Sequence, residues 1–162
     1  MGKVMALQGE RDQAEAMLDE TIADSAPSDR FFSGPLQYGV LALITEDPEV
    51  RRRSLEQGEE LLQAGSIGHN YLFFYREAME AALRGGDAEG IEHYAQLLEE
   101  NTAGEPTPWS RFFVTRGRLL ARHVRDTTDA ESIAALRELR DRAFDIGFRV
   151  AGKGIESALE RT

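Results

Sequence analysis

The chain has 162 residues, about the size of one domain, so we do not expect a catalytic domain beside a separate receptor domain. Its 29 acidic and 19 basic side chains give a formal charge of -10, which disfavours binding to nucleic acid and to anionic membrane surfaces. No cysteine is present, which excludes disulfides, thiol nucleophiles and thiolate metal sites.

Apolar residues recur at helical spacing along nearly the whole chain, and no convincing alternating strand pattern occurs. Residues 2–7 offer a short opening helix. A second helix is predicted to begin just after Gly9 and to bury one face, made of Ala14, Met17, Leu18 and Ile22. The next helix is predicted to begin near Gly34, because Pro35 suits a first helical turn, where a missing N–H costs nothing.

The later helices are marked by capping residues. An aromatic-rich helix is expected at about 70–83, and a short last helix at about 155–160. The other predicted helices begin after Asp47 with Pro48, after Asp87, after Thr107 with Pro108, and after Thr128, which has capping-box spacing with Glu131.

The predicted helices repeat in pairs. The caps of the second helices, Asp47, Asp87 and Thr128, are separated by intervals of 40 and 41 residues, a period typical of an α-solenoid. We therefore predict an all-α fold in one domain over residues 1–162, with about seven helices stacked as antiparallel pairs into a short right-handed solenoid. First helices of each pair line the concave surface of such stacks, here segments 34–45, 69–83 and 109–124.

Several fragments carry a resemblance to known families. Leu7-Gln-Gly-Glu-Arg-Asp-Gln-Ala and Leu83-Arg-Gly-Gly-Asp-Ala-Glu resemble the interhelical turn of tetratricopeptide repeats. A longer likeness includes Gly34-Pro-Leu-Gln-Tyr-Gly-Val-Leu-Ala-Leu, Glu46-Asp-Pro-Glu-Val-Arg-Arg-Arg-Ser-Leu, Gly68-His-Asn-Tyr-Leu-Phe-Phe-Tyr-Arg-Glu and the Pro-Thr-Pro-Trp junction at 106–109. From about Gly34 to Ile146 the chain resembles the C-terminal helical-repeat region of bacterial multidomain signalling proteins with adenylate or guanylate cyclase and ATPase domains upstream.

This resemblance implies a regulatory or interaction segment, since the catalysis of that family lies in upstream domains. The chain is then expected to be a C-terminal fragment of a larger bacterial signalling protein, without enzymatic activity and without a cofactor. The longest aliphatic run, Val40 to Ile44, is far shorter than a membrane span, and the lack of cysteine fits a reducing compartment. We therefore predict a cytoplasmic protein that binds neither membranes nor nucleic acid.

Two patterns that suggest a ligand site are rejected. Residues 147–154 have the glycine and lysine spacing of a phosphate-binding P-loop, but Gly154 stands where a Ser or Thr must reach magnesium. A glycine-rich break between the last two helices is expected instead. None of the three histidines forms the i, i+4 pair of a helical zinc site, so no metal is expected; His69 is predicted to cap a helix and His93 to be solvated.

Basic and aromatic side chains mark the candidate surfaces. Spacings of seven, four and three residues place four arginines on one helical stripe, Arg111, Arg118, Arg122 and Arg125. A solvated face explains this stripe better than a site for an acidic peptide or anion, although both stay open. Two adjacent aromatic side chains cannot both face one core, so one of each pair is expected in a groove or at a repeat interface, for Phe73 with Phe74 and for Phe112 with Phe113.

The predicted function is a non-enzymatic interaction or regulatory module that binds a protein, a peptide segment or an upstream domain. The predicted partner-binding residues are Asn70, Phe74 and Glu77 from one helix with Arg111 and Arg118 from another. The alternative is a small-molecule sensor that controls an upstream catalytic domain, with a closed cavity lined by Tyr71, Phe74 and Trp109.

The start of the predicted stack raises the question of self-association. Residues 2–7 form too short a helix to cover Met17, Leu18 and Ile22 together, and a large exposed apolar patch is unusual for a stable monomer. We therefore expect this face to be covered by upstream helices of the parent protein, or by a homodimer through the N-terminal end.

Overall fold

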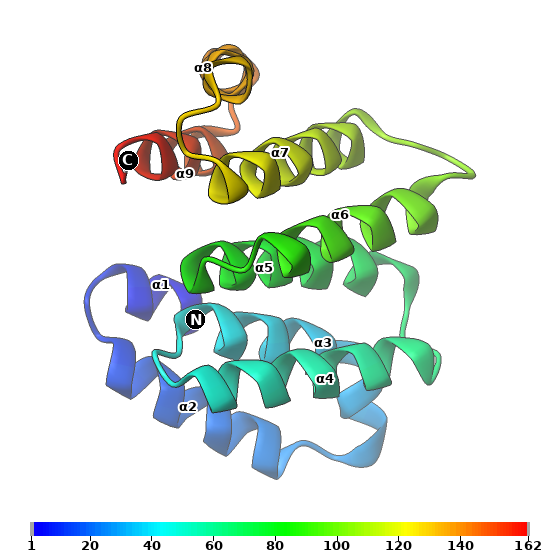
Figure 1. The fold of residues 1–162 in the computed structure, drawn as a ribbon. Coiled ribbons are helices and arrows are strands. Elements are labelled where there is room, and N and C mark those ends of the chain that lie inside the picture. The colour runs from blue at the N-terminus through cyan, green and yellow to red at the C-terminus, as the bar shows by residue number, and fades with distance from the viewer. Residues whose placement is uncertain (1, 162) are drawn as a thin grey trace. The chain divides into compact units, whose positions relative to one another are not determined.

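A computed structural model describes residues 2–161, apart from the side chains of Leu7, Pro27 and Ser28 (Figure 1). All regular structure in this range is helical, with nine α-helices and no strand, which confirms the predicted all-α class. The chain divides into unit 1, residues 1–85, and unit 2, residues 86–162. One continuous solenoid domain over residues 1–162 stays a prediction.

Unit 1 contains five helices, of which α3 is the central one. Helix α3 packs against α4 and α5, while α2 packs against α1 and α3. The bounds are α1 Gly2–Leu7, α2 Arg11–Asp24, α3 Pro27–Ile44, α4 Pro48–Gln63 and α5 Gly68–Gly85. Helix α4 begins as predicted, because the Asp47 carboxylate accepts hydrogen bonds from the N–H groups of Glu49 and Val50 at 2.8 and 3.3 Å.

Helix α3 begins seven residues earlier than predicted, at Pro27, and Pro35 lies inside it. A proline there has no N–H to donate to the carbonyl four residues earlier, which belongs to Phe31. That carbonyl instead accepts hydrogen bonds from Ser66 Oγ at 2.5 Å and from Asn70 Nδ2 at 3.4 Å. The internal proline is therefore tolerated because side chains just before α5 and in its first turn replace the missing backbone donor.

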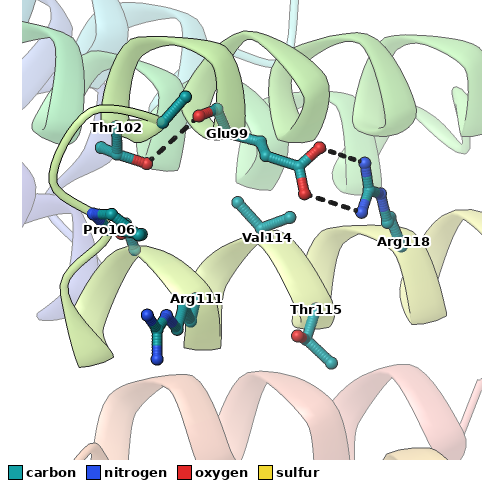
Figure 2. Close-up of a pocket in the computed structure, with 9 residues that line it drawn as sticks. Glu99, Thr102, Pro106, Arg111, Val114, Thr115 and Arg118 are labelled. Atoms are coloured by element: carbon teal, nitrogen blue, oxygen red, sulfur yellow. Dashed lines mark hydrogen bonds and ion pairs between the residues drawn. The ribbon is translucent and has the colours of Figure 1, made fainter.

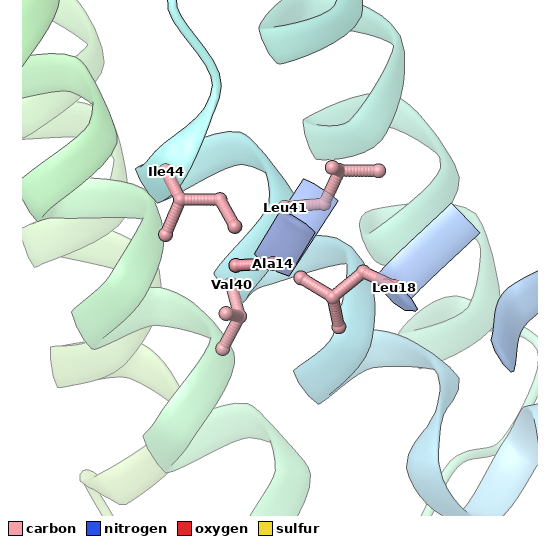
Figure 3. Close-up of a cluster of buried hydrophobic side chains, with 5 residues drawn as sticks. All are labelled: Ala14, Leu18, Val40, Leu41 and Ile44. Atoms are coloured by element: carbon pink, nitrogen blue, oxygen red, sulfur yellow. The ribbon is translucent and has the colours of Figure 1, made fainter. Parts of the chain in front are cut away.

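The expected exposure at the N-terminal end is not observed. Ala14 and Leu18 of α2 are buried against Val40, Leu41 and Ile44 of α3 (Figure 3). Met5 and Ala6 of α1 and Ile22 of α2 pack on the same cluster, and Gly2 lies against the Leu18 side chain. Helices α1 and α3 together cover the apolar side of α2, so the predicted exposed face was wrong, while a homodimer through this end stays a prediction.

Unit 2 contains four helices, each packed against the next along the chain. Their bounds are α6 Ala88–Thr102, α7 Pro108–Arg125, α8 Ala130–Asp145 and α9 Arg149–Leu159. Two predicted caps are confirmed: the Asp87 carboxylate accepts from the Gly90 N–H at 2.9 Å, and Thr107 forms a reciprocal capping box with Ser110. Residues 2–161 contain nine helices rather than about seven, and the last one, α9, is longer than the predicted segment 155–160.

The cap of α8 is Asp129, not Thr128. The Asp129 carboxylate accepts from the N–H groups of Glu131 and Ser132, while Thr128 donates its hydroxyl to Asp126. We expect Asp129→Ala to lower the midpoint of thermal unfolding more than Thr128→Ala does, because only Asp129 satisfies free N–H groups of the first turn. Circular dichroism melting of both variants is the measurement; a larger loss in Thr128→Ala contradicts the assignment.

The same cap gives an expected pH dependence. Burial opposes ionisation of Asp129, but the N–H of Ser132, the Arg122 guanidinium and the N–H of Glu131 outweigh it and hold the pKa of Asp129 below its ordinary value. A lowered pKa in the folded state means that the cap stabilises α8 at neutral pH and loses this effect as the pH falls through the lowered pKa. The difference in melting temperature between wild type and Asp129→Ala should therefore shrink in acid.

The rejected P-loop pattern is mostly helical. Helix α9 begins at Arg149, six residues before the predicted last helix, so only residues 146–148 form the predicted break and Gly152 to Gly154 lie within the helix. A β-carbon at Gly154 would lie 2.7 Å from Nη2 of Arg116, a side chain buried at 1% exposure. Gly154 therefore makes room for a buried arginine, which is a packing role rather than phosphate binding.

The helix order keeps a regular period. Three long helices begin at Pro27, Gly68 and Pro108, which are 41 and 40 residues apart, and their successors begin at Pro48, Ala88 and Ala130, which are 40 and 42 apart. The predicted period along the sequence is therefore observed in the helix boundaries, while the stacking of antiparallel pairs stays a prediction. In the described range, no helix combines the length and the apolar character that crossing a membrane requires.

Candidate functional site

The five predicted partner-binding residues have two different environments. In unit 1, Asn70, Phe74 and Glu77 of α5 are buried, with exposures of 2%, 0% and 0%. In unit 2, Arg111 and Arg118 of α7 are exposed. The three α5 residues are therefore not available to a partner as contact residues, and the prediction for them was wrong because each is used inside unit 1.

Asn70 connects the start of α5 to the first half of α3 by hydrogen bonds. Its Nδ2 donates to the carbonyl of Phe32 at 2.8 Å, to that of Phe31 at 3.4 Å, and lies 2.7 Å from Ser66 Oγ. These carbonyls lie just before the internal Pro35, where helical bonds are interrupted. Asn70 is thus a positioning residue that holds the backbone of Phe31 and Phe32.

Phe74 and Glu77 have close neighbours on facing helices. The Phe74 ring fits against Gly58 of α4, where a β-carbon would lie only 2.1 Å from Cε2, and against Gly39 of α3. The Glu77 carboxylate forms ion pairs with Lys3 of α1, at 2.5 Å, and with Arg76. Both side chains therefore join helices of unit 1 rather than meeting solvent.

The aromatic patch is a set of exposed apolar residues on α3, on α5 and just before α5. It is made of Phe31, Phe32, Leu36, Ile67 and Phe73. It holds five of the eight large hydrophobic residues that are exposed in the described structure, and Phe32 is 64% exposed. Edge-on ring contacts at 6.3 Å join His69 to Phe32 and to Phe73, and the Arg76 guanidinium lies 5.4 Å from the Phe73 ring centre. His69 thus connects Phe32 of α3 to Phe73 of α5 within the aromatic patch.

The α6–α7 pocket is a second candidate surface, within unit 2 (Figure 2). It has a volume of about 410 Å³ and lies between the end of α6, the connecting loop and the first turns of α7. Its lining is Glu99, Thr102, Ala103, Pro106, Ser110, Arg111, Val114, Thr115 and Arg118. Figure 2 shows Arg118 directed at Glu99, with Val114 between the two helices.

The arginine stripe of α7 is largely neutralised by neighbouring carboxylates. Arg118 pairs with Glu99 and Glu92 of α6, and Arg125 lies 3.8 Å from Glu92. Arg122 pairs with Glu131 and with Asp129, and these hydrogen bonds raise the pKa of Arg122 above its ordinary value. These pairs agree with the solvated-face interpretation for three arginines, and Arg111 is the stripe's one member without an ion pair in the described part of the chain.

The adjacent aromatic pairs behave differently. Phe73 is exposed while Phe74 is buried, which confirms the expectation for the first pair. Phe112 and Phe113 are both buried, and both rings contact Phe148, with centroids 5.1 and 6.0 Å away. The expectation that neighbours on a helix cannot share a core was wrong here, because one large ring between α8 and α9 reaches both.

The three histidines lie on three different helices, α5, α6 and α7. No group of three or more possible ligands that could hold a metal ion occurs among the described residues. His93 is exposed as predicted, whereas His69, predicted as a helix cap, has its ring between Phe32 and Phe73 in the aromatic patch. His123 is buried near the end of α7.

No protein-family model, no curated protein and no solved structure matches this chain. The resemblance to the helical-repeat region of cyclase-type signalling proteins therefore stays a prediction.

Proposed function

We propose that this chain is a non-enzymatic protein–protein interaction module and that unit 1 binds a peptide segment of a partner protein through the aromatic patch. The observation that carries the proposal is the clustering of exposed Phe31, Phe32 and Phe73 on two packed helices. Contiguous exposed apolar surface is uncommon in soluble proteins and marks interaction sites. Aromatic residues are also enriched at the centres of protein interfaces.

Hydrogen bonds hold the backbone at the α3 part of the aromatic patch. Hydrogen bonds from Ser66 and Asn70 fix the carbonyls of Phe31 and Phe32, and Phe73 lies on the same helix as buried Phe74. A surface held in place before binding loses little conformational entropy when a partner arrives. We expect the partner segment to present aliphatic or aromatic anchors, because the patch offers mainly apolar area.

The wider context is also a proposal. We propose that the helix pairs form a short right-handed, tetratricopeptide-like solenoid, which the regular spacing of helix starts supports. The resemblance of residues 34–146 to the C-terminal region of bacterial cyclase-type signalling proteins supports a regulatory role in the cytoplasm. The partner is then a protein, a peptide segment or an upstream domain of the parent protein.

The sensor alternative is less well supported at its predicted cavity. Phe74 fills the space beside Gly58 and Gly39, and the Tyr71 hydroxyl donates to the Leu62 carbonyl at 2.8 Å. Trp109 packs on Phe113 in unit 2, with ring centres 4.5 Å apart. These contacts favour the interaction module over a sensor with a closed aromatic cavity.

The test is selection of a displayed random-peptide library on the immobilised protein, with calorimetry on the enriched peptides. We expect one-to-one binding that weakens at least about tenfold in Phe32→Ser/Phe73→Ser, since buried aromatic anchors dominate such interfaces. Val150→Ser is the matched control, because Val150 is 74% exposed but belongs to α9 of unit 2. Enrichment that is equal on wild type and on Phe32→Ser/Phe73→Ser contradicts the proposal.

A further inference from the structure

We infer that the α6–α7 pocket binds the carboxylate group of a small organic acid, independently of the aromatic patch in unit 1. The pocket volume of about 410 Å³ lies within the range of small-molecule sites, roughly 300–1,000 Å³. Its charged lining residues are Arg111, Arg118 and Glu99, so the pocket itself carries one net positive charge in a strongly acidic protein.

Arg111 supplies the primary anion contact. It lines the pocket, is exposed and has no ion pair within residues 2–161, unlike the other arginines of its stripe. A guanidinium is always charged and presents a planar fork of N–H donors that matches a carboxylate. An organic acid that enters the pocket thus meets a cation that no carboxylate of the described chain already occupies.

The Arg118–Glu99 pair shows how a carboxylate is held on the other side of the pocket. Nη1 and Nη2 of Arg118 donate to the two carboxylate oxygens of Glu99 at 3.1 and 2.5 Å (Figure 2). Both side chains are about half exposed, at 45% and 51%, and exposed ion pairs contribute little to stability. A ligand carboxylate can therefore replace Glu99 on Arg118 at small cost, which makes Glu99 an internal competitor.

The remaining lining favours an acid with a short apolar part. Val114, Pro106 and Ala103 provide apolar contact beside the charged groups. The Thr102 hydroxyl is already donated to the Leu98 carbonyl at 2.8 Å, so it adds no donor for the ligand. A short aliphatic acid uses both kinds of lining, whereas inorganic phosphate uses only the charged one.

The probes are butyrate, its neutral counterpart butyramide, and inorganic phosphate, each titrated into the full chain and followed by amide NMR shifts. We expect saturable shifts at the pocket residues with butyrate, no such shifts with butyramide, and weaker binding of phosphate. If the shifts do not saturate with butyrate, or if butyramide gives equal shifts, the assignment is overturned. Tighter binding of phosphate than of butyrate also overturns it, because the site is then a general anion site.

Two substitutions should change butyrate affinity in opposite directions. Arg111→Gln should weaken binding at least about tenfold, because a charge-assisted hydrogen bond is lost. Glu99→Gln should strengthen it about threefold to fivefold, because the bidentate competitor for Arg118 is removed and only the longer contact with Glu92, at 3.7 Å, remains. If Glu99 only supported the structure of the pocket, Glu99→Gln would lower the affinity for butyrate. Weaker butyrate binding by Glu99→Gln therefore contradicts the inference.

Controls separate binding from folding. Arg137→Gln removes an exposed arginine of α8 that lies outside the pocket, and it should bind butyrate like wild type. Thr115→Phe adds bulk at a lining position of the pocket without changing its charge and should abolish the saturable shifts. Each variant is checked by circular dichroism melting; unchanged butyrate binding by a folded Thr115→Phe overturns the assignment of the pocket.

Discussion

Gly58→Ala is expected to lower the free energy of unfolding by about 3 kcal/mol, which is large for the addition of one methyl group. The added β-carbon would lie 2.1 Å from Cε2 and 2.7 Å from Cζ of Phe74, far inside contact distance. The ring has little room to move, because Phe74 is fully buried and its Cδ2 also lies close to Gly39 of α3. The clash must therefore separate α4 from α5 or distort α4.

The matching change on the other side of this contact is Phe74→Ala, with an expected loss of about 4 kcal/mol from burial and cavity formation. In the double variant Gly58→Ala/Phe74→Ala the smaller side chain leaves space for the new methyl group. Its loss should therefore be less than the sum of the two single losses. This non-additivity separates a direct contact from two independent destabilisations.

Urea unfolding followed by circular dichroism measures these losses, and hydrogen exchange over α3, α4 and α5 locates them. Gly68→Ala is the matched control in the same unit, because a β-carbon there meets no atom within 4 Å. If Gly58→Ala unfolds at the same urea concentration as Gly68→Ala, the described contact with Phe74 is not present in solution.

The elements that sequence analysis predicted well are those set by local chemistry. A capping residue followed by a first-turn proline marks a helix start locally. This pattern predicted the starts of α4, at Asp47 and Pro48, and of α7, at Thr107 and Pro108, and the structure confirms both. The start of α3 was predicted too late in the chain, because whether Pro35 can lie inside a helix depends on residues far away in the sequence. The carbonyl it leaves without a donor is satisfied by Ser66 and Asn70, more than thirty residues away along the chain.

The same misplacement hid the aromatic patch. With the helix start set near Gly34, Phe31 and Phe32 fell in a connecting segment, where their relation to Phe73 is not visible from spacing. A sequence signal was nevertheless available, because Pro27 also suits a first helical turn and a helix from there places Phe32 one turn before Leu36. The predicted start of α3 depends on which proline, Pro27 or Pro35, is placed in the first helical turn.

The misjudged binding residues have a related physical reason. An amide, an aromatic ring and a carboxylate on one helix are the side chains that binding sites use, and they are also the ones that join helices internally. Asn70, Phe74 and Glu77 are each matched to a specific partner on another helix of unit 1, such as the Phe32 carbonyl or Lys3. Such pairings join residues far apart in the chain, so spacing within α5 gives no indication of them.

The Lys3–Glu77 ion pair is expected to hold α1 on unit 1. The Glu77 side chain is 1% exposed, so its carboxylate depends on Lys3 and Arg76 for charge compensation. Lys3→Met should lower the free energy of unfolding by about 2 kcal/mol, the worth of a hydrogen bond between charged groups. Glu77→Gln should cost about 3 kcal/mol, because it leaves two neighbouring cations without their carboxylate.

A double-mutant cycle tests whether the two residues act as a pair. With Lys3→Met and Glu77→Gln combined, the loss should fall below the sum of the single losses by about 1–2 kcal/mol. Lys153→Met is the control, because Lys153 is the chain's other lysine and is exposed on α9. Strict additivity of Lys3→Met and Glu77→Gln contradicts a direct pair.

Release of α1 from unit 1 should expose apolar surface on α2, and this surface can cause self-association. Without α1, the Leu18 side of α2 loses the cover that Gly2, Met5 and Ala6 provide. Lys3→Met should therefore raise hydrogen exchange in α1 and α2 and, through the newly exposed apolar surface, produce a concentration-dependent increase in mass by light scattering. Wild type and Lys153→Met should show neither change at the same concentrations. If Lys3→Met exchanges and scatters like wild type, then apolar packing alone holds α1, and a homodimer through this end would need a different surface.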